Sequence, residues 1–228
     1  MTLEPVVVHT IVRADATVVA RLAALGVAST HEAQGRRGLL HPSIRPIQTG
    51  VRVAGPAVTV LCQPGDNLMI HLAVEQCRPG DVLVVAMASA SSDGVLGELL
   101  ATSLRAHGVI AAVLDAGVRD VADLRAMGFP VWSRWISAAG TSKAGAGAIN
   151  RPVVCADQAV AAGDVIVADD DGVVCVPARQ AAEVAEHAER RVANEEITRT
   201  RLAAGELTVD LLGLREVADR AGVRYVDR

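Results

Sequence analysis

Apolar and polar residues alternate along this chain with a period that changes between helical and extended segments. Two short continuous apolar runs, Val82–Ala86 and Val109–Leu114, are typical of strands that are buried on both faces. Two other segments, Asp15–Leu25 and Val95–His107, predict helices, and each is followed by a glycine that can end it. The first half of the chain therefore predicts helices that alternate with buried strands.

The second half of the chain predicts shorter strands joined by tight turns. Gly-Asp and Asp-Gly pairs separate the strands expected over Val153–Cys155, Asp164–Ala168 and Val173–Val176. Alternating helices and strands followed by hairpin-like strands predict a mixed sheet in a layered α/β fold. The other expected elements are a turn of helix at Thr30–Gln34, one bent strand or two strands over Val51–Leu61, a helix from Asp66 to Cys77, a short helix over Val121–Met127, a strand over Val131–Trp135 and a loop of small residues over Ser137–Asn150.

A long helical pattern occupies the C-terminal part of the chain. It covers Ala178–Ala204, about 40 Å at 1.5 Å per residue, and we expect Gly205 to end it and a second helix to follow over Asp210–Ala221. A domain of this size does not need so long a helix to cover itself. We therefore expect one α/β catalytic domain over residues 1–177 and a helical arm over residues 178–228 that packs on a neighbouring subunit. The alternative is a helix that lies along its own domain.

Composition supports one α/β domain and argues against several functions. The 228 residues are 51% apolar, but Trp, Tyr and Phe together number four, so Ala, Val, Leu and Ile must build the core. A net charge of −4 and so few aromatic rings leave neither the basic surface nor the stacking platforms of nucleic-acid binders. No apolar run approaches the ~18 residues of a membrane helix, and the first residues do not resemble a secretory signal. We expect a cytoplasmic protein with no nucleic acid and no membrane as partner.

Two residue types limit the possible chemistry. The four cysteines, Cys62, Cys77, Cys155 and Cys175, form no Cys-x-x-Cys pair, so we expect buried thiols and not a zinc or dithiol site. Lys143 is the only lysine among the 22 Lys and Arg residues. An enzyme that works through a Schiff base would depend on it, and a metal-assisted route is the natural alternative.

The most informative residues are an acid and an Arg-Asp pair. Glu98 lies in Gly97-Glu98-Leu99-Leu100 at an expected helix start, and twenty residues separate it from Arg119, which with Asp120 follows a buried strand. Helix starts and strand ends are where α/β folds usually build sites. One carboxylate can help to hold a hard dication, and an arginine can pair with a carboxylate and stabilise an enolate oxygen. The alternatives are a helix cap for Asp120, a surface salt bridge for Arg119 and a helix-dipole contact for Glu98.

This constellation resembles the divalent-metal pyruvate aldolases that cleave 4-hydroxy-4-methyl-2-oxoglutarate and 4-carboxy-4-hydroxy-2-oxoadipate. Their superfamily also contains the regulator of ribonuclease E activity. The resemblance implies a layered α-β-β-α fold of the swivelling-domain type with a mixed sheet, assembled as a homotrimer or homohexamer. It extends over nearly the whole chain, through His31-Glu32-Ala33-Gln34-Gly35-Arg36, Asp66-Asn67-Leu68-Met69-Ile70-His71, Asp115-Ala116-Gly117-Val118-Arg119-Asp120, Phe129-Pro130-Val131-Trp132-Ser133-Arg134, Ala168-Asp169-Asp170-Asp171-Gly172 and the C-terminal arm.

The resemblance also implies roles for the matching residues. Asp120 would hold the divalent cation, Mg²⁺ or Mn²⁺, and Arg119 would contact the pyruvate half of a 2-oxo acid substrate. The segment Gly97–Leu100 would bind the same substrate, with the backbone amides near Leu99 and Leu100 holding a carboxylate. The acid twenty residues before Arg-Asp and the long C-terminal helix favour the enzymes over their non-catalytic relatives.

Two glutamates are candidates for moving protons. Glu98, where the family often has Asp, would orient a metal-bound water or take protons. Glu195 follows Val192 in an apolar stripe of the long helix, where a carboxylate must be paired or must coordinate something. It would either meet an arginine across an interface or reach a neighbour's active site, as a glutamate in the matching Ala-Asn-Glu-Glu stretch of the family does. Asn67 and His71 are weaker candidates, because a helix cap and a structural histidine explain them equally well.

The expected function is that of a metal-dependent class II pyruvate aldolase, a carbon–carbon lyase of aromatic-acid degradation. It would cleave 4-carboxy-4-hydroxy-2-oxoadipate to pyruvate and oxaloacetate, and 4-hydroxy-4-methyl-2-oxoglutarate to two pyruvates. Oxaloacetate decarboxylation is an expected side activity. The alternatives are a non-catalytic inhibitor that docks on a ribonuclease or helicase, and a metal-dependent lyase of the same fold that acts on a different oxo acid.

Overall fold

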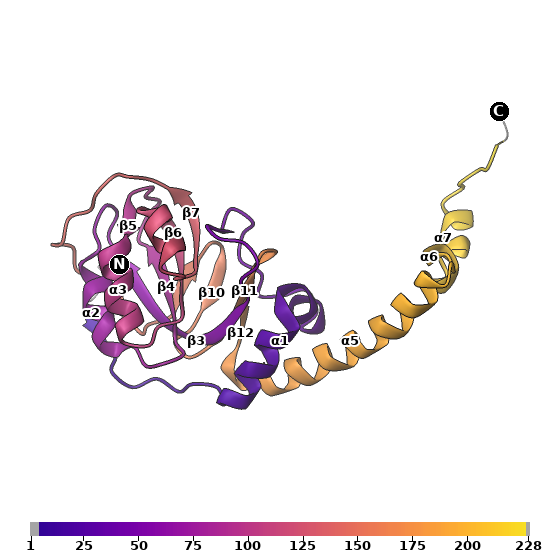
Figure 1. Ribbon diagram of the computed structural model, residues 1–228, viewed down its shortest axis with the longest axis horizontal. Coiled ribbons are helices and arrows are strands. Elements are labelled where there is room, and N and C mark those ends of the chain that lie inside the picture. The colour runs from indigo at the N-terminus through magenta and orange to yellow at the C-terminus, as the bar shows by residue number, and fades with distance from the viewer. Residues whose placement is uncertain (1–4, 227–228) are drawn as a thin grey trace. The chain divides into compact units, whose positions relative to one another are not determined.

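The structure is a computed structural model that describes residues 5–226 (Figure 1). Its internal contacts divide the chain between Ala188 and Glu189 into two compact units. The first two turns of the long C-terminal helix belong to the larger unit, so this division lies beyond residue 177, where the sequence places the start of the arm. That the arm packs on a neighbouring subunit stays a prediction.

The larger unit is built on a mixed sheet, to which ten strands contribute within the described residues. Its centre consists of four neighbouring parallel strands, β3 (Val53–Cys62), β4 (Val82–Met87), β6 (Ala111–Val118) and β7 (Val131–Ile136). The sheet is extended by β1 (Val6–Val7) and β8 (Ala148–Ile149) beyond β3, by β2 (Arg45–Pro46) beside β7, by β5 (Gly94–Leu96) beside β6, and by the antiparallel pair β11 (Val165–Asp169) and β12 (Gly172–Val176). A separate hairpin is formed by β9 (Val153–Cys155) and β10 (Gln158–Val160).

Strand β3 belongs to two parts of this sheet. Residues 53–56 pair antiparallel with β11, whereas residues 57–62 pair in parallel with β4. The change of partner falls directly after Gly55-Pro56, and proline is tolerated where a strand lacks a regular ladder bond. The sequence was compatible with one bent strand or with two strands in this region, and the structure has one continuous strand.

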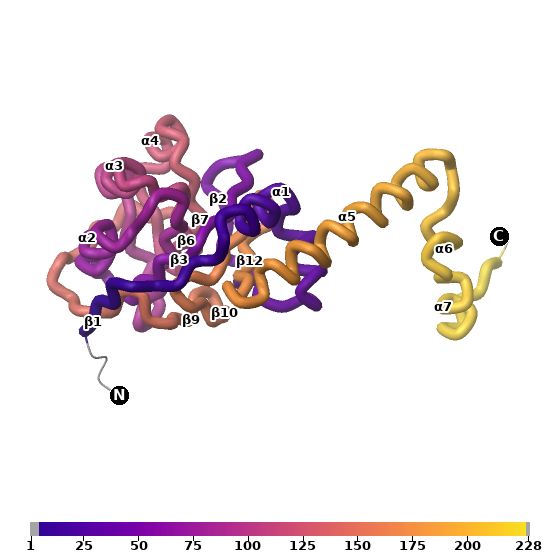
Figure 2. Tube along the Cα trace, turned by 90° about the horizontal axis from the view of Figure 1, so that it is seen from below, coloured from indigo at the N-terminus to yellow at the C-terminus, as the bar shows by residue number. Residues whose placement is uncertain are grey.

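Helices cover the sheet and complete its layers. The larger unit contains α1 (Ala16–Ala33), α2 (Leu68–Ala73) with a following 3₁₀ turn (Val74–Gln76), α3 (Glu98–Ala106), α4 (Val121–Ala126) and, after a 3₁₀ turn (Ala178–Gln180), the start of α5 (Ala181–Ala203). Helices α2, α3 and α4 lie on one side of the sheet and the β9–β10 hairpin on the other (Figure 2). Helix α1 packs with β11, β12 and the first turns of α5 in a further apolar cluster.

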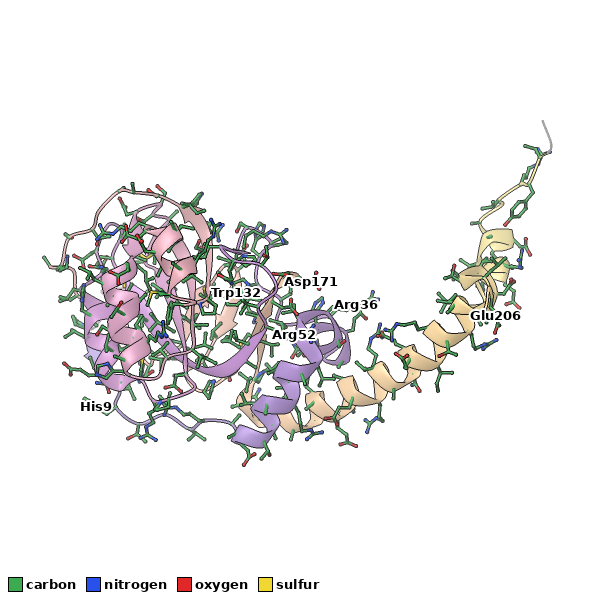
Figure 3. The ribbon with its side chains drawn as sticks, viewed as in Figure 1. His9, Arg36, Arg52, Trp132, Asp171 and Glu206 are labelled. Atoms are coloured by element: carbon green, nitrogen blue, oxygen red, sulfur yellow. The ribbon has the colours of Figure 1, made fainter. Side chains whose placement is uncertain are left out.

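The core follows the alternation of side chains along each central strand. On β6, Ala112 and Leu114 face the helices, whereas Ala111 and Val113 face the opposite layer. Trp132 on β7 is fully buried in that opposite layer, and its indole nitrogen donates to the backbone oxygen of Asp169 at 2.8 Å (Figure 3). Small aliphatic residues thus fill two layers, one on each face of the sheet, and the predicted layered α/β fold with a mixed sheet and a long C-terminal helix is confirmed.

Several predicted boundaries near the strand ends were wrong. Val95 and Leu96, predicted as the start of a helix, belong to strand β5, and the helix starts only at Glu98. Strand β6 continues to Val118, beyond the apolar run that predicted it. The short strands β8 and β10 were missed, because two or three residues give no usable periodicity.

The smaller unit contains the remainder of α5 and two short helices, α6 (Thr208–Leu211) and α7 (Leu214–Arg220). The sequence predicted one helix over residues 210–221, but Gly213 adopts a left-handed conformation, φ 63°, between the two. No residue of the unit is buried within the described range 189–226. Large apolar side chains are exposed there, among them Ile197, Leu207, Leu212, Val217 and Tyr225. None of the helices described is long and apolar enough to cross a membrane.

Candidate active site

A cavity of about 240 Å³ opens where β5 and β6 end. Four segments form its wall: the start of α2, the connection from β5 to α3, the connection from β6 to α4, and the loop before β8. The residues that line it are Asn67, His71, Gly94, Val95, Gly97, Leu99, Leu100, Arg119, Asp120, Gly140, Thr141 and Lys143. The structure therefore brings the Gly97–Leu100 segment and the Arg-Asp pair together, as their spacing suggested.

Arg119 and Asp120 form the two-residue connection between β6 and α4. Asp120 is held in the left-handed region, with φ 54° and ψ 39°, which costs free energy for a residue with a side chain and often occurs at functional sites. Its carboxylate does not cap α4, so the helix-cap alternative lacks its hydrogen bond. Instead, Asp120 Oδ2 lies 3.1 Å from the backbone nitrogen of Glu98 and 3.6 Å from Nε of Arg119.

Gly97 makes this close approach possible. A Cβ atom at this position would lie 2.3 Å from Asp120 Oδ2 and 2.9 Å from Arg119 Nε, closer than real Cβ contacts allow. Gly97 itself has an extended backbone, so clearance and not conformation requires the glycine. The position of the Asp120 carboxylate therefore requires a residue without a side chain at position 97.

The first turn of α3 supplies backbone donors at the cavity wall. The helix ladder starts with the hydrogen bond from Ala101 N to Gly97 O at 3.0 Å, so the amides of Leu99 and Leu100 precede it. Both residues line the cavity, and the helix start carries a partial positive charge. This arrangement suits a carboxylate, as expected for these two residues.

The side chain of Glu98 lies elsewhere. Its Oε1 accepts a hydrogen bond from the Thr102 hydroxyl at 2.8 Å, one turn further along α3. With Arg105 and Met127, Glu98 borders a separate, open hollow of about 400 Å³ and not the cavity. The structure thus brings the backbone of Glu98 to Asp120 and leaves its carboxylate at Thr102, a geometry that does not support the expected role of this carboxylate in proton transfer.

Lys143 lines the cavity, whereas its sequence context had suggested only the possible role of a Schiff-base lysine. It lies in the loop before β8, and with Arg119 it gives the cavity two cationic side chains beside the single carboxylate of Asp120. His71 on α2 is also in the wall; burial and then the charge of Lys143 lower the pKa of its imidazole. The signal available in the sequence was the isolation of the only lysine in a loop of glycine and other small residues.

Asn67 is almost fully buried in the same wall. Its Nδ2 donates to the backbone oxygen of Val95 at 2.9 Å, which fixes the orientation of the amide. Its Oδ1 is buried and has no hydrogen-bond partner within the described residues. A buried acceptor without a donor is uncommon in a folded protein and suits a site that receives one from a ligand.

Glu195 belongs to the smaller unit and does not line the cavity of the larger one. The apolar stripe of α5 is buried at Ala181, Val184 and Ala188, but Val192 is exposed. Glu195 pairs with Arg191 of the same helix at 2.9 Å, and its side chain is 43% exposed. A role in the active site of a neighbouring subunit stays a prediction.

The donor set of the cavity fits a hard dication that keeps most of its water. Among residues 5–226, Asp120 is the one carboxylate in the wall, and no group of three or more His, Cys, Asp or Glu side chains is placed to hold a metal. Mg²⁺ is commonly held by one or two carboxylates together with water and ligand oxygens. A zinc site of three or four protein ligands does not fit these residues.

The other hollows of the larger unit offer less chemistry. One of about 320 Å³ is bordered by Gly50, Val51, Arg52 and Asp169–Asp171, whose positions Figure 3 marks at Arg52 and Asp171. Two of its three carboxylates already accept backbone hydrogen bonds, Asp169 from Val27 and Asp170 from Gly50. Three of the cysteines are buried and Cys77 is partly buried, and burial raises the pKa of the Cys62 thiol to about 12.

Comparison with known proteins gives consistent matches over most of the chain. A family model described as "RraA-like: Aldolase/RraA" matches residues 14–175. A protein of Halalkalibacterium halodurans named "Putative 4-hydroxy-4-methyl-2-oxoglutarate aldolase" is 32% identical over 157 residues, which cover 69% of this chain and 75% of that protein. A protein of the same name from Burkholderia multivorans is 34% identical over 142 residues, covering 62% and 86%.

Solved structures with the same fold include proteins described as inhibitors. Streptomyces coelicolor RraAS2, described as an unusual member of the RNase ES inhibitor RraA protein family, has a TM-score of 0.75 at 29% identity and covers 83% of this chain and 99% of its own. The RNA-processing inhibitor RraA from Thermus thermophilis has a TM-score of 0.56 at 23% identity, covering 73% and 94%, which shows the fold alone.

Proposed function

Because this chain belongs to the RraA-like (Aldolase/RraA) family, we propose that it is a divalent-metal-dependent lyase that cleaves 4-hydroxy-2-oxo acids to pyruvate and a second oxo compound. The observation that carries the proposal is the cavity wall itself. It combines the guanidinium of Arg119, the carboxylate of Asp120, the amides of Leu99 and Leu100 and the ammonium of Lys143. Such a set can bind an anionic oxo acid and stabilise charge that develops on its keto oxygen.

Asp120 is the residue that would hold the dication, Mg²⁺ or Mn²⁺, with its carboxylate already fixed beside the start of α3. When bound, the ion supplies Lewis-acid stabilisation of negative charge on a substrate oxygen. Asn67 contributes a buried acceptor on the same wall. The chain's own groups then determine how the substrate is bound and where protons move.

Arg119 and the helix amides would bind the reacting end of the substrate. A guanidinium pairs with a carboxylate through two parallel hydrogen bonds, and the amides of Leu99 and Leu100 add donors at the helix start. In the cleavage, a base takes the C4 hydroxyl proton, the C3–C4 bond breaks, and its electron pair forms the enolate of pyruvate. Arg119 would stabilise this enolate until a proton returns to C3.

Lys143 would bind the far end of the substrate. Lys143 and Arg119 both line this small cavity, so two cations are available to a ligand that carries more than one carboxylate. The proposed substrates are therefore 4-carboxy-4-hydroxy-2-oxoadipate and 4-hydroxy-4-methyl-2-oxoglutarate. Oxaloacetate, which has the same oxo acid end, would be decarboxylated through the same enolate.

We propose that the proton carrier comes from another copy of the chain. No carboxylate besides Asp120 lines the cavity among the described residues, and the carboxylate of Glu98 is bonded to Thr102. Glu195 lies in a unit with large exposed apolar side chains, and these side chains can be buried only against another surface. A homotrimer or homohexamer in which Glu195 reaches a neighbour's cavity meets both requirements.

The second candidate function is that of a non-catalytic binding protein. The similarity to RraAS2 favours it, because that protein is described as belonging to a family of ribonuclease inhibitors. In that case the protein would not turn over any of these substrates, and it would bind to an immobilised ribonuclease in a pull-down experiment. A Schiff-base aldolase is less well supported, because such a lysine is desolvated and Lys143 is exposed.

The test is release of pyruvate from the two hydroxy-oxo acids and from oxaloacetate, with Mg²⁺, with Mn²⁺ and with excess EDTA. The proposal expects turnover that EDTA abolishes and that either metal restores. EDTA-resistant turnover that borohydride inactivates would instead support the Schiff base. Absence of turnover with every substrate and metal would favour the binding protein.

A further inference from the structure

Asp66 is a buried carboxylate beside the cavity that does not line it. It lies between the end of β3 and the start of α2, its residue is 2% exposed, and it is missing from the cavity wall. Burying a charge costs free energy unless hydrogen bonds compensate for it. The hydrogen-bond partners of this carboxylate therefore show which segments of the chain it joins.

The partners of Asp66 come from two different walls of the cavity. Its Oδ1 accepts from the backbone nitrogen of Leu68 at 2.8 Å, in the first turn of α2. Its Oδ2 accepts from the Ser142 hydroxyl at 2.5 Å and from the backbone nitrogen of Ala144 at 2.7 Å. One side chain thus joins the helix that carries Asn67 and His71 to the loop that carries Lys143.

Backbone hydrogen bonds complete this junction. Ser142 N donates to Gly65 O at 2.8 Å, and Asn67 N donates to Ser142 O at 3.1 Å. Both neighbours of Lys143, Ser142 and Ala144, are therefore held at Asp66. Hydrogen bonds therefore hold the residue before Lys143 and the residue after it.

Elsewhere the loop is held mainly near its two ends, where it accepts hydrogen bonds from Gly94 N at Ala139 O and from Gln63 Nε2 at Ala146 O. Residues 137–146 are partly or fully exposed, and most of them are Gly, Ala or Ser, which contribute little apolar contact and lose much backbone entropy when ordered. Burial alone would raise the pKa of Asp66, but the hydrogen bonds from Ala144, Ser142 and Leu68 hold it at about 2. The carboxylate stays ionised at neutral pH, so the junction is permanent there.

We propose that Asp66 is a positioning residue that fixes the loop so that Lys143 faces the anionic substrate in the cavity. The inference rests on the proposed function for the identity of the ligand, but the junction itself can be measured without turnover. Asp66 acts through Lys143, so removing Asp66 should have no further effect once Lys143 is gone. This coupling distinguishes positioning from a general contribution to stability.

The first experiment is a double-mutant cycle on kcat and KM with Asp66→Asn and Lys143→Ala. Asp66→Asn should lower kcat/KM about 10- to 100-fold, mainly through a higher KM. The asparagine side chain has one acceptor oxygen, and its NH₂ group is a donor that cannot accept the hydrogen bonds from Ser142 and Ala144 that Oδ2 accepts. In the Lys143→Ala background the same change should cost less than about 2-fold. Asp157→Asn removes an equal charge from the exposed β9–β10 turn and should change nothing. Equal losses in both backgrounds would overturn the proposal.

The second experiment does not need activity. Hydrogen exchange of the Ala144 amide should be slow in the wild type and at least about 10-fold faster in Asp66→Asn, with exchange in β4 and β6 unchanged. If Asp66→Asn does not fold, Ser142→Ala removes one hydrogen bond without changing charge and should show the same effect on a smaller scale. Unchanged exchange at Ala144 in the folded variants would contradict the junction. If the wild type has no turnover, the proposed function fails while this measurement still tests the junction.

Discussion

Asp120 and Glu195 are carboxylates of nearly equal exposure, 40% and 43% of their side chains, in two regions that hold them very differently. In the cavity, the backbone of Asp120 is fixed between a central strand and a helix, and the glycine clearance at residue 97 admits its oxygen beside Arg119. In the C-terminal unit, Glu195 is held by one pair with Arg191 a turn away. Such a pair contributes only about 0.3–0.5 kcal/mol at a surface.

The cavity and the C-terminal unit differ in how far one chain determines the positions of their functional groups. The cavity is specified by contacts within one chain, so its groups are positioned before a ligand arrives, which is what electrostatic stabilisation of a transition state requires. In residues 189–226 no side chain is buried, so Glu195 can change partner at little cost. A preformed half and an adaptable half are expected where a second copy completes a site.

The largest effect is expected from Asp120→Ala and Arg119→Ala. Each removes a group that the proposal places on the reacting end of the substrate, and each should lower kcat/KM by about 10³-fold or more. Pyruvate release measures the loss, and Asp123→Ala, on the exposed side of the adjacent helix α4, is the matched control. Full activity in either cavity variant would refute the mechanism.

The next largest effect is expected from Gly97→Ala. Its Cβ would lie 2.3 Å from Asp120 Oδ2, so the carboxylate must move, and a displacement of about 1 Å can cost about 10²-fold in rate. Gly140→Ala is the matched control, because a Cβ there would lie 3.7 Å from Arg119 Nη1, an ordinary contact. If both alanine variants behave alike, the clearance at Gly97 has no catalytic importance.

Glu195→Gln should lower activity about 10- to 100-fold if its carboxylate moves a proton in a neighbour's cavity. Glu196→Gln, which removes the adjacent charge, should be nearly silent. The sharper measurement mixes subunits of Asp120→Ala with subunits of Glu195→Gln after mild dissociation. Hybrid oligomers should regain activity, because one of their cavities then has both carboxylates. A mixture that stays as inactive as its components would place Glu195 outside the site.

Glu98→Gln should change kcat/KM by less than about 3-fold, as expected of a substitution outside the reacting groups. Its carboxylate accepts from Thr102, while the contact to Asp120 comes from the backbone and survives the change. Gly97–Leu100 would keep its amides in place. A loss above about 10²-fold would instead support Glu98 as the group that takes protons.

The smallest effect concerns His71. Burial and the charge of Lys143 lower the pKa of its imidazole, so His71 is neutral at pH 7 and gains a proton only at lower pH than usual. Removing the charge in Lys143→Ala should therefore move this pKa upward, toward its ordinary value. Proton NMR titration of the ring measures it, with His107 as a control on the far end of α3. If the pKa of His71 is the same in Lys143→Ala as in the wild type, the charge of Lys143 does not act on this imidazole.

The sequence predicted the layered fold and the meeting of the Gly97 segment with Arg119-Asp120, because buried apolar runs fix the strands and strand ends fix the connections. It could not show that Glu98 turns its side chain to Thr102, because rotamer choice depends on neighbours that spacing does not reveal. Nor could it show Lys143 in the cavity, because its loop is held by Asp66, 77 residues earlier in the chain, through hydrogen bonds that leave no periodic signal. The proposed role of Glu195 in a neighbour's cavity requires a second copy of the chain, and the pattern of one sequence does not specify how two copies meet.

If this cavity stabilises the enolate of pyruvate, the methyl protons of pyruvate should exchange with D₂O in its presence, and proton NMR measures this exchange. We expect exchange that requires protein and Mg²⁺ or Mn²⁺, that stops with EDTA, and that falls by about 10³-fold in Arg119→Ala. Exchange of equal rate in wild type and Arg119→Ala, or no exchange with either metal, would contradict it.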